Sequence, residues 1–420
     1  MYPVWNFITG YSVLLVLGAV VAVVWANVDA ESYQYFTEFM IWQDAPIGVL
    51  VADGSGGAVR DLTLQYLVND VLMALFFAIA AKEVWEAVIL KNGALRGKKA
   101  ATPLIATLGG ILGPIAVYLG LAYFLGSSTY DALANGWAIP TATDIAFSYV
   151  VGRIVFGAGH PAVRFLLLLA IADDAAGLLI LAVFYPEAAM TPSWLLLSAG
   201  AAVAVFVLAN WLPRYLDRGD QLRRRSSWVR RKLSFWPYAL AGCACWYGFQ
   251  EAGLHPALGL LPIVLTIPHA DRAFGIFSAA EVHLHDLLNT MGRALKFPVA
   301  ITLGLFGLMN AGVAFSAMGE ATWLVLAGLL IGKPLGIFVF GWIAARPLGL
   351  GLPLGMRMVD LLVIGIVAAI GFTVSLFVTS VAFEPGPIQD AARMGALLSF
   401  AAALIAVITG RVTKVQKQQI

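Results

Sequence analysis

Charge is scarce in this chain. Only 12% of its 420 residues are charged, whereas 60% are hydrophobic, and the mean hydropathy is +0.85. An average soluble domain carries about 25% charged residues, so little of this surface can face water. The composition excludes a disordered chain, a nucleic-acid-binding protein and a secreted disulfide scaffold. It predicts a polytopic membrane protein.

Cysteine is also nearly absent. The two cysteines, Cys243 and Cys245, stand two residues apart in an apolar run. On a helix that spacing directs their side chains about 200° apart, so they cannot form a disulfide with each other. They indicate nothing about the redox compartment.

Apolar runs of about 20 residues predict an all-α fold with about twelve transmembrane helices. The first run is expected to be a retained helix, because residues 1–6 lack the basic residue of a cleavable signal peptide. The predicted spans lie near residues 8–27, 64–90, 101–125, 137–155, 163–184, 192–212, 233–252, 254–268, 297–315, 321–344, 358–382 and 389–410.

Lysine and arginine predict the orientation of these spans. If both termini are cytoplasmic, 22 of the 26 basic residues fall in cytoplasmic segments and only Arg60 lies on the opposite face. Such a bias is the positive-inside signal. The basic run around Arg223, Arg224 and Arg225 could suggest RNA or anionic lipid, but a topogenic loop beside the bilayer explains it better.

One external segment, residues 45–63, predicts a β-hairpin around Asp53-Gly54-Ser55-Gly56-Gly57. An exposed hairpin offers an edge strand on which a second copy of the chain can pair. An ordinary ordered loop is the alternative.

Two adjacent aspartates, Asp173 and Asp174, stand near the centre of the fifth span. Each mid-membrane carboxylate costs about 2.5–3.5 kcal/mol on insertion scales, which favours a functional site over a structural pair. Carboxylate oxygens suit a small hard cation. Two like charges so close also favour protonation of one of them, so protons are natural competitors.

Helix-breaking sequence occurs in two further spans. The fourth carries Thr141, Thr143 and Asp144 after a proline, and the eleventh is interrupted at Gly371 and Thr373. Broken backbone at membrane depth is tolerated only where it lines a cavity. Asp144 could neutralise the positive ends of the half-helices. Lys333, in the tenth span, could neutralise the negative ends or pair with an aspartate.

Spans 3–5 and 10–12 follow the same order. A Gly-Pro or Gly-Lys-Pro site precedes a broken helix and then a third span, and Pro114 and Pro334 are 220 residues apart. The pattern predicts inverted repeats with two broken helices crossing at the midplane, as in secondary transporters. The expected segments are 1–100 (interface helices with the hairpin), 101–190 (first core repeat), 191–316 (interface helices) and 317–420 (second core repeat).

At these motifs the chain resembles the NhaA sodium/proton antiporters over nearly its whole length. The matching motifs are Thr141-Ala-Thr-Asp144-Ile-Ala-Phe, Ile171-Ala-Asp173-Asp174, Ile331-Gly-Lys333-Pro-Leu-Gly, Ile370-Gly-Phe-Thr373-Val-Ser375, Val68-Asn69-Asp70, Asn310-Ala-Gly-Val and Gly253-Leu-His255. The resemblance implies a core of inverted repeats, a separate interface domain and homodimers formed through the external hairpin. It also implies cation binding at Asp174, with Asp173 paired to Lys333 in the unloaded state.

The chain departs from the family pattern at the cytoplasmic mouth. Where the family has Glu-Val-Lys-Arg-Glu, this sequence has Lys82-Glu83-Val84-Trp85-Glu86. His255 corresponds to the family's pH-linked histidine, although a hydrogen-bonded structural role is equally open. The residues that could link activity to pH are Asp70, Lys82, Glu83, Glu86, His255 and Glu281.

The sequence therefore predicts an antiporter that exchanges Na⁺ or Li⁺ for H⁺ across a bacterial inner membrane. No cofactor is expected, and membrane lipids and a second copy of the chain are the expected partners. A cation channel or a non-transporting membrane sensor is the alternative. An intramembrane aspartyl protease is disfavoured, because its aspartates must face each other from separate helices whereas Asp173 and Asp174 are consecutive.

Overall fold

The computed structural model describes residues 3–52, 58–89, 100–186, 190–218, 224–268 and 287–418. Its helices group into two compact units. Unit 1 comprises Met1–Val4, Gln34–Asn92 and Leu181–Phe306, and unit 2 comprises Trp5–Tyr33, Gly93–Ile180 and Gly307–Ile420. Residues 5–33, which the sequence groups with the interface segment 1–100, cluster with unit 2.

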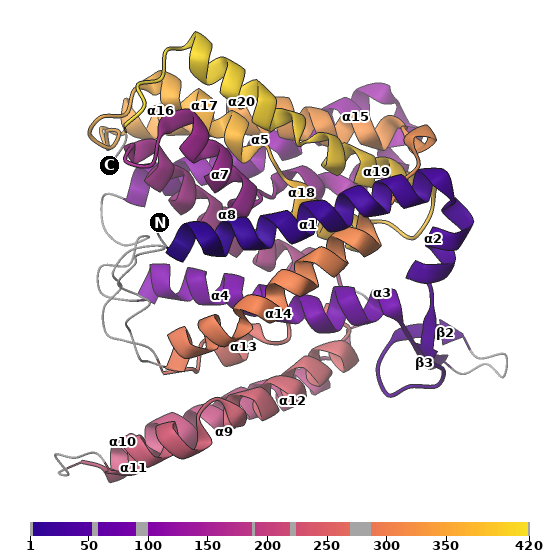
Figure 1. Ribbon diagram of the computed structural model, residues 1–420, viewed down its shortest axis with the longest axis vertical. Helices are drawn as coiled ribbons and strands as arrows, with labels where there is room; N and C mark the ends of the chain where they lie inside the picture. The colour runs from indigo at the N-terminus through magenta and orange to yellow at the C-terminus, as the bar shows by residue number, and fades with distance from the viewer. Residues whose placement is uncertain are drawn as a thin grey trace. The chain divides into compact units, whose positions relative to one another are not determined.

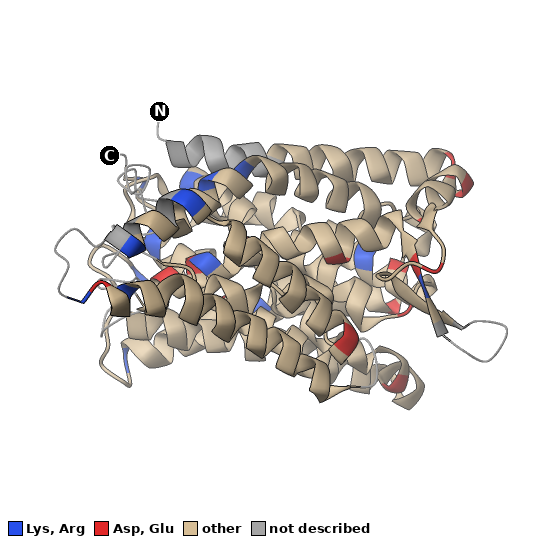
Figure 2. Ribbon diagram, turned by 90° about the horizontal axis from the view of Figure 1, so that it is seen from below, with Lys and Arg blue, Asp and Glu red and all other residues tan. Residues whose placement is uncertain are grey.

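The helices are those of a membrane protein. Among the described residues, seven helical segments are long and apolar enough to cross a bilayer, and the number is nine if each of two bent helix pairs counts as one span. Charged residues are sparse along these helices, as the few blue and red positions in Figure 2 show. The other predicted spans correspond to α1 (Pro3–Val28), α12 (Trp236–Ala252) and residues 254–268. The helical membrane fold is confirmed, and the number twelve stays a prediction.

Two predicted spans differ from the structure. Residues 254–268 form only the short helices η7 (Pro256–Leu258) and α13 (Leu261–Val264), because prolines and Gly259 interrupt the run. The ninth span, predicted from residue 297, is α14 (Leu287–Asn310). It begins ten residues earlier since Arg293 and Lys296 can lie along a helix with their charged heads in water.

Unit 1 contains a small antiparallel sheet. Strand β2 (Val49–Ala52) pairs with β3 (Ala58–Thr63), Val51 opposite Val59. Residues 53–57, the predicted turn, lie outside the described part of the chain. Strand β1 (Met40–Trp42), which the sequence does not signal, pairs with the other side of β3 and makes the order β1-β3-β2.

The remaining elements of unit 1 are helical, and α9 and α12 pack side by side (Figure 1). They are α3 (Leu64–Tyr66), η1 (Leu67–Leu72), α4 (Met73–Ile89), η4 (Pro192–Trp194), α9 (Leu195–Val205), η5 (Phe206–Trp211), α10 (Leu212–Leu216), α11 (Arg224–Trp228), η6 (Val229–Leu233), α12, η7, α13 and most of α14. The linking helix α2 (Ala30–Thr37) is shared between the two units.

Unit 2 holds the two bent helix pairs. After most of α1, its helices are α5 (Ala101–Leu125), α6 (Ser127–Leu133), η3 (Ala134–Thr141), α7 (Ile145–Phe156), most of α8 (Pro161–Phe184), η9 (Phe315–Ala317), α15 (Glu320–Ala327), η10 (Gly328–Gly332), α16 (Lys333–Ala345), α17 (Met358–Ala368), α18 (Phe372–Ala382), α19 (Pro387–Leu398) and α20 (Ala401–Val412). The chain bends by 55° between Thr141 and Ile145, and by 52° between Ala368 and Phe372. Both bends fall where the sequence predicts broken helices.

Glycines allow α5 and α16 to approach closely. A Cβ on Gly109 would lie 2.1 Å from the carbonyl oxygen of Gly336, and one on Gly113 would lie 2.3 Å from that of Gly332. Any side chain at these positions would collide with backbone, so the two helices pack backbone to backbone, as small-residue motifs permit in membranes. This contact fixes α16, whose first residue is Lys333.

Candidate functional site in unit 2

The two breaks meet inside unit 2. The Asp144 N–H donates to the Ile370 carbonyl over 2.8 Å, and the Thr143 hydroxyl donates to the Ala368 carbonyl over 3.1 Å. The Ser375 hydroxyl donates to the Ile139 carbonyl over 2.8 Å. Side chains and backbone of one break thus satisfy the groups that the other leaves without helical partners.

Asp144 neutralises two helix N-termini. As the N-cap of α7, its carboxylate accepts the Phe147 N–H over 3.1 Å. The other carboxylate oxygen accepts both the N–H (3.3 Å) and the hydroxyl of Thr373, in the first turn of α18. One negative charge therefore offsets the positive ends of two half-helices.

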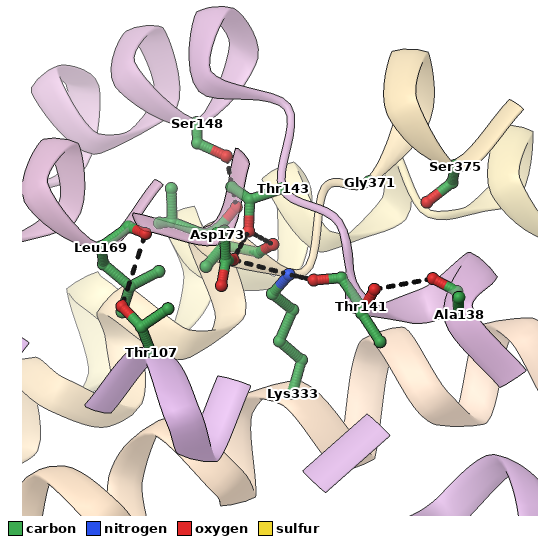
Figure 3. A network of polar contacts seen from close by, with 12 residues as sticks. Thr107, Ala138, Thr141, Thr143, Ser148, Leu169, Asp173, Lys333, Gly371 and Ser375 are labelled. Carbon is green, nitrogen blue, oxygen red and sulfur yellow. Dashed lines mark hydrogen bonds and ion pairs between the residues drawn. The ribbon is translucent and has the colours of Figure 1, made fainter. Parts of the chain in front are cut away.

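Lys333 serves the opposite end of a half-helix. Its side chain is fully buried, and its Nζ lies 2.9 Å from Oδ2 of Asp173. The same ammonium donates to the carbonyl of Thr141, the last residue of η3. Figure 3 shows Lys333 reaching up from α16 between these two acceptors. Both roles that the sequence left open for Lys333 are present together.

The acid pair keeps two carboxylate oxygens unused. Oδ2 of Asp173 accepts the Thr143 hydroxyl over 2.6 Å in addition to Lys333. Oδ1 of Asp173 and Oδ1 of Asp174 are buried and have no hydrogen-bond partner among the described residues. Buried polar atoms are normally satisfied, so two orphaned carboxylate oxygens on adjacent residues indicate a place where a cation or protons bind.

Gly371 and Gly110 leave room around this site. A Cβ on Gly371 would lie 2.3 Å from Oγ of Ser375, and one on Gly110 would lie 3.8 Å from Oδ1 of Asp173. The Gly371 N–H donates to Oγ of Ser399 over 3.3 Å. Gly371 therefore contributes to the shape of the break, through its backbone, rather than to the binding of the acids.

Sequence reasoning did not select two buried hydroxyls that support the breaks. Ser148 donates to the Val367 carbonyl over 3.0 Å, and Ser399 receives the Gly371 N–H. The available signal was a hydroxyl within an otherwise apolar span, which alone does not distinguish bonding across a break from bonding to the preceding turn.

The predicted mouth residues lie in unit 1. Lys82 is buried, with Nζ 2.9 Å from Glu86 and 3.2 Å from Glu83. Nδ1 of His255 lies 3.3 Å from Asp70 and also accepts the Ala257 N–H. Glu281 lies outside the described residues. Within the described ranges, no group of three or more His, Cys, Asp or Glu side chains could hold a metal ion.

The fold and this site are those of a membrane transporter class, in which buried charged residues lie beside two broken helices. The profile of the family described as Na⁺/H⁺ antiporter 1 matches residues 6–412. The chain is 81% identical to the Na(+)/H(+) antiporter NhaA of Jannaschia sp. (strain CCS1), over 100% of both chains. It is 42% identical to the NhaA of Geobacter sulfurreducens, over 98% of each.

The chain belongs to the NhaA family of Na⁺/H⁺ antiporters. As a member it is a transporter and not an enzyme, and its cargo is the ion rather than a resident cofactor. Among solved structures, the sodium proton antiporter MjNhaP1 from Methanocaldococcus jannaschii resembles it at a TM-score of 0.44 and 15% identity, over 98% of this chain and 97% of that chain. A likeness that remote supports no conclusion.

Proposed function

We propose that this protein exchanges Na⁺ or Li⁺ for protons by alternating access, with Asp173 and Asp174 as the shared binding groups. The observation that carries the proposal is the pair of buried, unpartnered Oδ1 atoms on these consecutive residues. Hard cations take oxygen ligands, and protons occupy the same oxygens. A site that holds either the cation or protons is the minimum requirement for exchange.

Lys333 is the charge that replaces the cation when the site is empty. Its contact with Asp173 at 2.9 Å balances one carboxylate and also the carbonyl end of η3. An arriving cation competes with this ammonium for Asp173. Asp144 and Thr373 hold the neighbouring break in place, while Thr141 and Thr143 connect it to Lys333 and Asp173.

The charges favour electrogenic exchange. If both aspartates release protons as one monovalent cation binds, two positive charges move one way for each one that moves the other way. A membrane potential then drives net transport.

Unit 2 is proposed as the inverted-repeat core. Gly109 faces Gly336, and Gly113 faces Gly332. Because the residue numbers increase along one helix where they decrease along the other, α5 and α16 run antiparallel. These are the first helices of the predicted repeats, and each is followed by one of the bent pairs. The opposite direction of these two helices, together with the same order of elements after each, supports inverted repeats within a fold of twelve spans.

The surroundings follow from the family and the sequence. Unit 1 is proposed as the interface domain, with the apolar, exposed strand residues Val49 and Leu50 forming a dimer contact by edge pairing. The charge bias supports an inner-membrane protein with both termini in the cytoplasm, embedded in lipid. The ion pairs of Lys82 and the contact between His255 and Asp70 are proposed to modulate, not to carry, the exchange.

The test uses purified protein in liposomes that contain a pH dye. Adding Na⁺, Li⁺ or K⁺ outside in turn should alkalinise the lumen only for transported cations, because each cation that enters is exchanged for protons that leave. Exchange predicts a proton flux that requires the cation. A cation current with no accompanying proton movement would indicate a channel instead.

A further inference from the structure

The residues after α20 run back across one end of unit 2. The chain turns at Lys414, whose φ is 49°, and the Val415 N–H donates to the Gly410 carbonyl over 3.0 Å. This is a helix-ending hydrogen bond of the Schellman kind. Val415 then packs against the buried cluster that contains Phe156 and Leu361. The turn and this packing set the direction of the segment.

Backbone hydrogen bonds join the segment to the α7–α8 connection. The Gln418 N–H donates to the Phe156 carbonyl over 3.1 Å, and the Gly159 N–H donates to the Gln418 carbonyl over 3.0 Å. Gly157 has a φ of +84°, and a Cβ there would lie 2.5 Å from the Gln418 carbonyl oxygen. We call residues Thr413–Gln418 the strap.

A third helix is joined to the strap by Arg357. Its Nη2 lies 3.3 Å from the Lys414 carbonyl and 3.5 Å from the Thr413 carbonyl. The same nitrogen donates to Asp360 over 3.1 Å, and Asp360 accepts the Arg357 N–H at the start of α17. The strap therefore contacts the ends of α7 and α17 and the loop that starts α8.

Each of these helices leads to the ion site. Asp144 stands twelve residues before Phe156 on α7, and Asp173 stands twelve residues after Pro161 on α8. At 1.5 Å per residue both acids lie about 18 Å along their helices from the strap. Along α17, the Ala368 carbonyl that accepts Thr143 lies about 15 Å from the residue that follows Arg357.

We propose that the strap is a positioning element for the ion site. It holds the far ends of three helices that carry Asp144 at the opposite end of α7, Asp173 midway along α8 and Ala368 at the opposite end of α17. This inference rests on the proposed function of the acid pair. Because packed helices transmit displacement as nearly rigid rods, releasing their far ends loosens the hydrogen bonds between the two breaks. Sodium affinity, which depends on carboxylate placement, falls.

The experiment compares two truncations and two substitutions of the full chain. A chain ending at Val412 lacks the strap, and a chain ending at Gln418 keeps it as the control. Gln418→Pro removes the N–H that bonds Phe156, while Gln418→Ala removes the same side chain and keeps that N–H. Each is measured for sodium KM and maximal rate in liposomes and for hydrogen exchange of residues 142–147 and 369–373.

Loss of the strap should raise the sodium KM about threefold to tenfold, with a smaller effect on maximal rate. Exchange should quicken in residues 142–147 and 369–373, which the strap does not touch. Gln418→Pro should shift both readouts in the same direction, and both controls should match the parent.

Unchanged KM and unchanged exchange at the breaks would overturn the proposal. So would a lower melting temperature with unchanged KM, since that is the mark of a merely structural role. If the parent itself shows no cation-dependent proton flux, the proposed function fails, and exchange at residues 142–147 and 369–373 still decides whether the strap positions the breaks.

Discussion

Lys333 and Asp173 form a fully buried ion pair, with 2.9 Å between Nζ and Oδ2. Each also forms a hydrogen bond with the break between η3 and α7. Lys333 donates to the Thr141 carbonyl, and Asp173 accepts the Thr143 hydroxyl. Residues from α16, α8 and the break between η3 and α7 thus depend on one another. In the proposed exchange, the pair couples the charge state of Asp173 to the shape of the break.

Lys333→Ala should destabilise the protein, because removing one partner of a buried pair leaves an uncompensated charge at a cost of about 3–5 kcal/mol. Asp173→Asn in the same chain should recover part of that loss. Melting temperatures in detergent of the parent, both single variants and the double variant measure the coupling. Simple addition of the two losses would show that the groups do not interact.

Asp174→Asn should abolish cation-dependent proton flux, since no neighbouring group can supply the lost carboxylate. Asp173→Asn should lose most of it. Asp131→Asn, at an exposed position on α6, is the matched control and should transport like the parent. Sodium affinity near that of the parent in Asp174→Asn would exclude Asp174 from the site.

Gly109→Ala should prevent α5 and α16 from packing, because the added Cβ would lie 2.1 Å from the Gly336 carbonyl oxygen. Overpacking of this kind costs about 1–3 kcal/mol, and more against rigid backbone. Gly120→Ala on the same helix meets nothing within 4 Å and should be neutral or mildly stabilising. Equal melting temperatures for the two variants would contradict the close backbone contact between α5 and α16.

The sequence predicted the breaks well, because their chemistry is local. Pro140, Thr141 and Asp144 predict a helix end and a helix cap within five residues. Gly371 predicts the second break. Mid-membrane charge singled out Asp173, Asp174 and Lys333 on cost alone. Such signals need no knowledge of the distant chain.

The sequence could not predict which residues far apart along the chain form hydrogen bonds with each other. That Thr143 bonds both Asp173 and Ala368, or that Ser399 receives the Gly371 N–H, depends on packing between segments far apart in sequence. Strand β1 was missed for the same reason, because three exposed residues acquire strand geometry only through pairing with β3. The start of α14 was wrong because hydropathy marks apolar length and not helix length.

Sodium and protons should compete directly if both bind Asp173 and Asp174. Activity then falls as pH drops, and a higher sodium concentration lowers the pH of half-activity. Lys82→Gln breaks the buried contacts with Glu83 and Glu86 and should change apparent sodium affinity while leaving this linkage in place. A half-activity pH in the parent that is independent of sodium would rule out competition as the control.

His160 should make the fold less stable in acid. Its Nδ1 accepts the Ala162 N–H over 3.1 Å at the start of α8, and its ring stacks on Phe156. Burial lowers the pKa of His160; the charge of Arg357 lowers it further, whereas the charge of Asp360 raises it. The unfolded chain therefore takes up this proton more readily than the folded protein. The stability that neutral His160 contributes is present above the unfolded pKa of about 6.5 and is lost as pH falls through the lower folded value.

His160→Asn tests this assignment, because asparagine is a preferred helix cap that keeps an acceptor for the Ala162 N–H but does not titrate. At pH 8 the variant should melt close to the parent. Between pH 7 and pH 5 it should lose less stability than the parent does, and the difference between the two curves isolates His160 from the acids of the ion site. Parallel curves would mean that the pKa of His160 is the same in the folded and unfolded states. A variant that melts far below the parent at pH 8 would show that stacking on Phe156, rather than the cap, is its main contribution.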